Sequence, residues 1–282
     1  MDEAPAPGPI RCQVEAGVAL VTLNRPERLN AFNGELGPAY DELMTRLGQD
    51  REVRVVVLTG AGKGFCAGAD AKELDKLSGS GAGGLRSRPP GAGHPVYDAL
   101  ADAPVEVRTR FLSPAALPQP VIAAVNGACA GVGLALACYS DVRFASETAV
   151  FAASFSRRGL IAEAGLAWIL PRLTGLGAAS DMLLSGRKVG AHEALRIGLV
   201  GEVTAPDQLL PRVLAYARDL AENVSPRSAA VIKRQLRAGQ DQSLREALDL
   251  GYVELRESVA SGDFREGVAA MRERRPPRFT GG

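Results

Sequence analysis

The chain has 282 residues, of which 46% are hydrophobic and 23% charged, a composition typical of a soluble protein with a packed core. Its 33 Lys and Arg against 32 Asp and Glu give a formal net charge of +1, so no basic excess points to nucleic acid or to a membrane surface. The N-terminal MDEAPAPGPI does not resemble a signal peptide, and no apolar run is long enough to span a membrane. We therefore expect a cytoplasmic protein with no nucleic-acid or membrane partner.

The first half of the chain alternates predicted strands and helices. Residues 16–24 and 54–60 are rich in Val and Leu and predict strands, while residues 32–49 between them space their apolar side chains at helical intervals. Residues 120–127 predict another buried strand, which a tightly packed helix of small residues follows, and residues 141–153 predict strand, turn and strand. We infer an α/β core.

The second half changes character, because its segments are helical in pattern and are separated by Gly or Pro. We divide the chain into a core over residues 1–203 and a C-terminal helical region over residues 204–282. One segment stands apart: residues 78–95, SGSGAGGLRSRPPGAGHP, are of low complexity and poor in apolar groups. We expect them to form a mobile insertion in the core.

The residue types argue against metal and side-chain nucleophile chemistry. Four cysteines are scattered without a CxxC pair, so we expect buried thiols in place of a zinc site or a disulfide framework. Only two histidines are present, and no serine lies in a GxSxG setting. Any chemistry is therefore expected to rest on carboxylates and backbone groups, without a metal.

Two glycine-rich loops follow predicted strands, at residues 59–70 (TGAGKGFCAGAD) and 131–136 (GVGLAL). The first is no P-loop, because Gly64 follows Lys63 where Ser or Thr is required, and neither loop has the GxGxxG pattern of dinucleotide binding. Each loop ends in a predicted helix start, which exposes backbone N–H groups that can converge on one oxygen. The alternative is that the small residues serve only close helix packing.

Several spaced motifs together resemble the crotonase (enoyl-CoA hydratase/isomerase) superfamily. They are, in chain order, LNRPERLNAF, VVVLTGAGKGFCAGADAKEL, PVIAAVNGACAGVGLALACYSDVRFAS, GLIAEAGLAWILPRLTG and LSGRKVGAHEALRIGLV. The resemblance implies a ββα spiral core with a C-terminal helical trimerisation region, assembled as a homo-trimer or hexamer. It also implies an acyl-CoA thioester as the substrate, so coenzyme A is part of the substrate and no separate cofactor is expected.

The resemblance also implies roles for individual residues. The two backbone N–H groups of the family's oxyanion hole, which hold the thioester oxygen, fall on Ala69 and Val132. Their neighbours Gly68 and Gly131 then belong to the substrate-binding site, where small residues let the thioester approach the backbone. The further residues implied to contact the substrate are Arg28, Leu29, Ala31, Ala67 and Asp70. For Asp70 we expect the capping of a helix start first and substrate contact second.

The catalytic acids depart from the hydratase pattern of the family. A hydratase uses two glutamates, one to activate water and one to deliver a proton, and the motifs place Ala135 and Phe155 at these positions. Glu163, in GLIAEAG, lies where the family's Δ3,Δ2-enoyl-CoA isomerases carry a single acid. Relatives that isomerise the ring of epoxidised aryl-acetyl-CoA carry an acid in a similar place. We therefore predict isomerisation of 3-enoyl-CoA to 2-enoyl-CoA with Glu163 as the proton shuttle.

Other interpretations of Glu163 and of the chain stay open. Leu160, Ile161 and Leu166 should raise the pKa of Glu163 toward the working pH, as suits a base that also acts as an acid. The structural alternative is a carboxylate in the first turn of a helix over residues 164–171, where the helix dipole favours it. The functional alternatives are hydration of 2-enoyl-CoA, ring isomerisation of an aryl-acetyl-CoA derivative, and a non-catalytic member that binds acyl-CoA or RNA.

Overall fold

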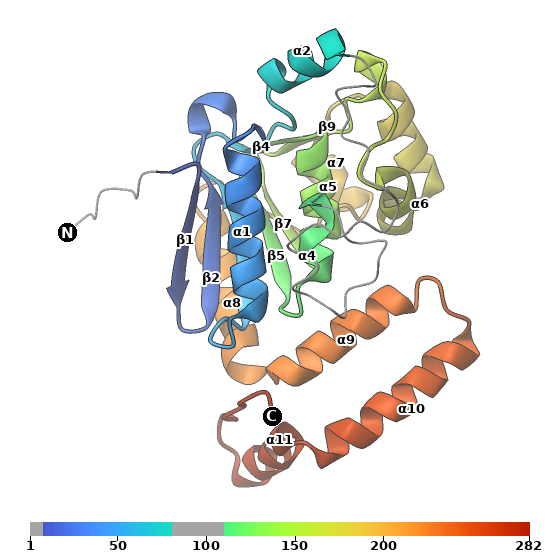
Figure 1. Cartoon of the computed structure of the whole chain (residues 1–282). Coiled ribbons are helices and arrows are strands. Elements are labelled where there is room, and N and C mark those ends of the chain that lie inside the picture. The colour runs from blue at the N-terminus through green and yellow to red at the C-terminus, as the bar shows by residue number, and fades with distance from the viewer. Residues whose placement is uncertain (1–7, 81–109) are drawn as a thin grey trace, which may run out of the picture.

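The computed structural model describes residues 8–80 and 110–282 of the chain (Figure 1). Of the insertion expected over residues 78–95, residues 78–80 form the end of a helix and the rest lies outside the described residues. Within the described part of the chain, no helix is both long and apolar enough to cross a membrane.

A six-stranded sheet forms the centre of the fold, with strand order β1-β2-β3-β5-β7-β10. Its strands are β1 (Ile10–Glu15), β2 (Val18–Leu23), β3 (Val55–Gly60), β5 (Val121–Val125), β7 (Val142–Ser146) and β10 (Glu202–Thr204). β1 pairs antiparallel with β2, and the other neighbouring strands run parallel. The strands predicted within residues 16–24, 54–60 and 120–127 are confirmed as β2, β3 and β5.

The chain also forms a second, smaller sheet of four strands, in the order β4-β6-β8-β9. Its strands are β4 (Gly64–Cys66), β6 (Ala128–Ala130), β8 (Val150–Ala152) and β9 (Val189–Gly190). β4, β6 and β8 each follow a strand of the large sheet after a short turn, and each precedes one of the helices α2 (Ala71–Ser80), α5 (Val132–Tyr139) and α6 (Leu166–Ser185). These consecutive ββα units confirm the predicted spiral core.

Helices cover both faces of the six-stranded sheet (Figure 1). On β3, Val56 and Leu58 belong to the hydrophobic cluster that contains α1 (Leu36–Gln49) and α5, while Val55 and Val57 belong to the cluster that contains α8 (Leu209–Asn223). Successive side chains of a strand point to opposite faces, so a strand buried on both faces is a continuous apolar run. Each such side chain stabilises the fold by roughly 1.5–3 kcal/mol when fully buried.

The last three helices, α9 (Pro226–Ala238), α10 (Leu244–Ala260) and α11 (Gly262–Glu273), form an arm below the sheets (Figure 1). Lys233 fastens α9 to the core, because its Nζ donates to the carbonyls of Pro114 and Gln119 at 2.6 and 2.9 Å and pairs with Asp141 at 2.7 Å. The remaining elements are the short helices η1 (Pro26–Arg28), η4 (Arg110–Leu112), α4 (Ser113–Ala116), η5 (Ser156–Arg158) and α7 (Ala191–Arg196). The helical content of the C-terminal region is as predicted; the division at residue 203 stays a prediction.

Candidate active site

The loop after β4 runs parallel to the loop after β2. The Ala67 N–H donates to the Leu29 carbonyl at 3.0 Å, the Phe32 N–H donates to the Gly68 carbonyl at 2.8 Å, and the Asp70 N–H donates to the Phe32 carbonyl at 2.8 Å. This pairing gathers most of the residues that were predicted to contact the substrate. Those on the paired segments are Leu29, Ala31, Ala67, Gly68 and Asp70, with Arg28 exposed at the end of η1.

Ala69 keeps its backbone N–H free because of how this pairing is built. Ala69 and Phe32 form a lone parallel bridge, in which both hydrogen bonds use the N–H and the carbonyl of Phe32. The N–H of Ala69 is therefore directed to the opposite side. Among the described residues it has no acceptor, and Ala69 is exposed, so the group is available to a ligand.

Val132 presents a second free N–H at the first position of α5, where a helix has no acceptor of its own. The described residues supply no acceptor from elsewhere. Gly131 before it has φ 55°, and its own N–H donates to the Ala152 carbonyl at 3.0 Å. A Cβ on Gly133 would stand 2.1 Å from the Cys66 carbonyl oxygen, so only glycine lets the helix start lie against the end of β4.

The two loops touch each other at Gly68 and Gly131. A Cβ built on Gly68 would lie 3.8 Å from the Gly131 Cα, and one on Gly131 would lie 3.7 Å from the Gly68 Cα. Ala69 follows the first glycine and Val132 the second, so their free N–H groups flank the same contact. The small residues thus allow close packing of the two loops, and each loop carries a backbone donor next to the contact.

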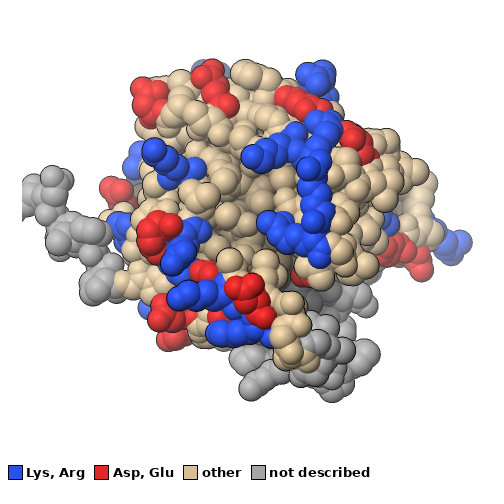
Figure 2. All heavy atoms as spheres, turned by 90° about the horizontal axis from the view of Figure 1, so that it is seen from above, with Lys and Arg blue, Asp and Glu red and all other residues tan. Residues whose placement is uncertain are grey.

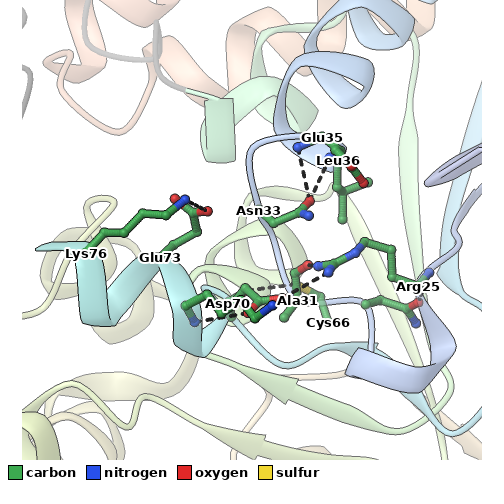
Figure 3. A network of polar contacts seen from close by, with 12 residues as sticks. Arg25, Ala31, Asn33, Glu35, Leu36, Cys66, Asp70, Glu73 and Lys76 are labelled. Carbon is green, nitrogen blue, oxygen red and sulfur yellow. Dashed lines mark hydrogen bonds and ion pairs between the residues drawn. The ribbon is translucent and has the colours of Figure 1, made fainter.

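Asp70 caps α2 and pairs with Arg25 (Figure 3). Its Oδ1 accepts the Lys72 N–H at 3.1 Å, and its Oδ2 accepts from Arg25 Nη2 at 3.0 Å, with the two side chains only 9% and 14% exposed. Arg25 also donates to the Ala31 carbonyl. The hydrogen bonds from Arg25 and then from Lys72 hold the pKa of Asp70 below its usual value. The predicted cap is confirmed, while substrate contact by Asp70 stays a prediction.

Asn30 and Arg25 organise this region, and their sequence pattern alone assigned them no role. The Asn30 side chain is fully buried, accepts the Arg25 N–H at 2.8 Å, and donates to the carbonyls of Ala61 and Gly64 at 2.9 and 2.7 Å. It ties the loop after β2 to the turn between β3 and β4. The signal available in the sequence was Asn30, the second asparagine of LNRPERLNAF, because Asn tolerates a positive φ, here 58°, and readily forms hydrogen bonds to backbone groups.

Glu163 lies in the loop between η5 and α6. Its side chain is half-buried, and none of the described residues donates a hydrogen bond to its carboxylate or forms an ion pair with it. Burial raises its pKa above the usual value of 4.5. A raised pKa and a free carboxylate are what a proton-transfer group requires.

The structure contradicts the alternative interpretation of Glu163 and one of its expected apolar neighbours. The helix begins at Leu166 and not at residue 164, so Glu163 precedes the first turn, and its carbonyl accepts the Leu166 N–H at 3.1 Å. The positive φ of Ala164 and Gly165, 51° and 67°, delays the helix start. Ile161 is 75% exposed and does not help to desolvate the acid, whereas Leu166 is buried and Leu160 packs on the core.

The cysteines and the other potential metal ligands form no metal site among the described residues. Cys66, Cys129 and Cys138 are buried free thiols, as predicted, while Cys12 is partly exposed. In residues 8–80 and 110–282 no group of three or more His, Cys, Asp or Glu could hold a metal ion.

Figure 2, which looks down on the α2 end of the molecule, shows a run of Lys and Arg side chains beside a hollowed, largely uncharged centre.

Comparison with known proteins now decides the family. The model of the enoyl-CoA hydratase/isomerase family matches residues 13–87 and 99–282. The chain belongs to the enoyl-CoA hydratase/isomerase family. It is 36% identical over 280 residues to 1,2-epoxyphenylacetyl-CoA isomerase of Escherichia coli, covering 96% of this chain and 98% of that protein. It is 39% identical over 273 residues to a probable enoyl-CoA hydratase of Rhodobacter capsulatus, covering 96% and 98%.

Solved structures agree with this placement in the enoyl-CoA hydratase/isomerase family. The crystal structure of an enoyl-CoA hydratase from Bacillus anthracis matches with a TM-score of 0.85 and 30% identity, over 97% of this chain and 100% of that one. The crotonase-like fold and an acyl-CoA enzyme are thereby established for this chain.

As a member of the enoyl-CoA hydratase/isomerase family, the chain has apolar groups where the resemblance implies the two hydratase acids. Ala135 is completely buried in the middle of α5. Phe155 is 7% exposed, and its ring atoms lie 3.9 Å from where a Cβ of Gly131 would stand. The ring therefore packs beside the loop of Val132 and places no carboxylate there.

Proposed function

We propose that this enzyme isomerises 3-enoyl-CoA to 2-enoyl-CoA with Glu163 as the proton shuttle. The observation that carries the proposal is the half-buried carboxylate of Glu163, which has no partner among the described residues, with apolar groups at Ala135 and Phe155. The ionised carboxylate removes a proton from C2 of the thioester, and the electron pair moves into a dienolate. Glu163 then returns the proton to C4, so the double bond moves from C3–C4 to C2–C3 and no atom is gained or lost.

The N–H groups of Ala69 and Val132 stabilise the thioester oxygen as negative charge develops on it. One donor of this kind typically lowers the barrier by about 3 kcal/mol. Both N–H groups belong to backbone that is already fixed, one by the bridge to Phe32 and one by the buried helix α5, so no reorganisation is needed during the reaction. Coenzyme A enters as part of the substrate, and no further cofactor takes part.

The acyl-CoA lies along the paired loops. We assign substrate contact to Arg28, Leu29, Ala31, Ala67, Gly68, Asp70 and Gly131. The cations that gather on the α2 end of the molecule suit the phosphates of coenzyme A, because nearby positive charge attracts anionic groups (Figure 2). Because the whole chain has a formal net charge of only +1, this run of cations is a local feature of the α2 end.

Ring isomerisation of an aryl-acetyl-CoA derivative is the second candidate. It is favoured by the 36% identity to a relative named 1,2-epoxyphenylacetyl-CoA isomerase. It also needs an oxyanion hole but opens an epoxide, so the two reactions use different substrates. Hydration ranks below both, because it calls for a second acid that neither Ala135 nor Phe155 supplies.

The assembly we propose is a homo-trimer or hexamer formed through the C-terminal arm, in the cytoplasm. Large apolar side chains are exposed along the arm, more than isolated surface residues would explain. They include Leu236, Leu244, Leu248, Tyr252, Val253, Leu255, Val259 and Met271. A second and third copy of the chain are the occupants that would cover them.

The test supplies 3-enoyl-CoA, 2-enoyl-CoA and an aryl-acetyl-CoA epoxide separately to the wild-type protein and to Glu163→Gln. Ultraviolet absorbance detects the conjugated thioester, and mass spectrometry detects added water. A conjugated product of unchanged mass from 3-enoyl-CoA, lost in Glu163→Gln, supports the proposal. Glu73→Gln is the matched control, because Glu73 is a carboxylate of α2 that pairs with Lys76 on the surface. A product heavier by one water from 2-enoyl-CoA alone would replace isomerisation with hydration.

A further inference from the structure

The loop that carries Glu163 has few ties to the rest of the protein. The Leu160 N–H donates to the Phe155 carbonyl at 3.0 Å where the loop begins. Between residues 161 and 165, α6 donates to the Glu163 carbonyl from the Leu166 N–H and to the Gly165 carbonyl from the N–H groups of Trp168 and Ile169. From outside this loop and α6, the described part of the chain adds one hydrogen bond, donated by the Tyr139 hydroxyl to the Gly165 carbonyl at 3.2 Å. Since the Glu163 carboxylate itself has no partner among the described residues, its position depends on this backbone.

Tyr139 and Gly165 also fit each other sterically. A Cβ on Gly165 would come within 2.4 Å of the Tyr139 hydroxyl oxygen, so the hydroxyl occupies the space that any larger residue would need. The φ of 67° at Gly165 favours glycine for a second, independent reason. Burial raises the pKa of Tyr139 to about 12, so the hydroxyl keeps the proton it donates at any physiological pH.

The same helix reaches both halves of the site. Val132 opens α5 with its free N–H, and Tyr139 is the last residue of α5. All eight residues between these ends, inclusive, are buried, and a helix of that length spans roughly 12 Å. Arg237 of α9 holds the far end, donating to the Tyr139 carbonyl at 3.0 Å and pairing with Asp141 at 3.1 Å. A rigid element thus fixes the distance between the oxyanion donor and the anchor of the Glu163 loop.

We infer that Tyr139 is a positioning residue, whose hydroxyl sets Glu163 relative to the oxyanion N–H groups through the Gly165 carbonyl. The inference rests on the proposed role of Glu163 and adds a residue that never touches the substrate. Removing the hydroxyl removes the hydrogen bond between the loop and α5 and leaves the acid, the N–H donors and the bonds from α6 to the Gly165 carbonyl in place. Substrate binding along the paired loops is then preserved, while proton transfer suffers from a misplaced base.

Tyr139→Phe removes the hydroxyl and keeps the ring. We expect kcat for the isomerisation to fall by about 10- to 100-fold, since a misplacement of the order of 1 Å can cost that much, with KM changed less than about twofold. The freed carboxylate becomes better hydrated, so the acidic limb of the kcat profile should move to lower pH. The matched control is Tyr40→Phe, which loses a buried hydroxyl contact of 2.7 Å to Ser113 and should keep the kcat and the pH profile of the wild type.

A second variant protects the test against a general loss of stability. Gly165→Ala pushes a Cβ toward the Tyr139 hydroxyl, so it should lower kcat in the wild-type background and lower it less in the Tyr139→Phe background, where that oxygen is gone. Wild-type kcat in Tyr139→Phe, or an equal loss in Tyr40→Phe, would overturn the inference while leaving the proposed function intact. Full activity in Glu163→Gln, measured alongside, would overturn the proposed function itself.

Discussion

Phe155 packs its ring against Gly131, with ring atoms 3.9 Å from the Cβ position of that glycine. Gly131 immediately precedes Val132, whose N–H has no acceptor among the described residues, so an aromatic ring borders the proposed oxyanion site. An apolar border lowers the local dielectric and would strengthen a hydrogen bond from the Val132 N–H to an oxyanion.

Activity should depend on pH through Glu163. The base must be ionised, and burial raises its pKa above 4.5, so kcat should fall as the pH drops through a value above that of an ordinary glutamate. A pH profile of kcat for the wild-type protein measures this limb directly. A limb at or below the ordinary value would contradict a desolvated base.

The donor at Val132 can be removed without changing the side-chain chemistry of the site. Proline has no N–H and is favoured at the first position of a helix, which is where Val132 lies. We expect Val132→Pro to lower kcat/KM by about 100- to 1000-fold. Val132→Ala keeps the N–H and serves as the control. Steady-state kinetics and thermal unfolding of both variants separate the effect of losing the N–H donor from the effect of losing side-chain packing. Equal losses in the two variants would argue against an oxyanion role.

The ion pair of Asp70 and Arg25 should contribute to stability. Asp70→Asn keeps an acceptor for the Lys72 N–H but leaves Arg25 without its charged partner, so we expect a loss of about 1–3 kcal/mol in the free energy of unfolding near pH 7. Because the folded state lowers the pKa of Asp70, the stabilisation is present above the unfolded pKa near 3.8 and is lost as the pH falls through the folded value. Denaturant unfolding of the wild type and of Asp70→Asn at a series of pH values measures this stabilisation. A difference in the free energy of unfolding that persisted at a pH below the folded pKa of Asp70 would contradict this account.

The exposed apolar arm should hold the oligomer together. Leu244 and Leu248 on α10 are 78% and 53% exposed, and replacing both with Glu would place charges in the proposed interface. We expect light scattering coupled to size-exclusion chromatography to show smaller particles than for the wild type. Leu184→Glu, at an equally exposed position on α6, should leave the particle mass unchanged. An unchanged mass in the α10 variant would place the interface elsewhere.

The fold was largely predictable because its signals are local. Strands such as β3 are continuous apolar runs buried on both faces, and the motifs follow one another in a fixed order. Two short strands gave no such signal: β4 and β6 have three residues each, too few to show a pattern, so they were interpreted as loop and helix start. Their pairing is decided by distant partners, which no local pattern records.

By itself, the sequence indicated the family, predicted two loops that expose backbone N–H groups and the cap at Asp70, and pointed to Glu163 as the candidate acid. Only the tertiary structure decided that Arg25 pairs with Asp70, 45 positions away along the chain, and that Glu163 precedes its helix instead of lying in it. It alone placed the Tyr139 hydroxyl on the Gly165 carbonyl, 26 positions away. Local propensity governs which residues form an element, whereas contacts between elements depend on how the buried faces pack, and that packing settles where each functional group lies.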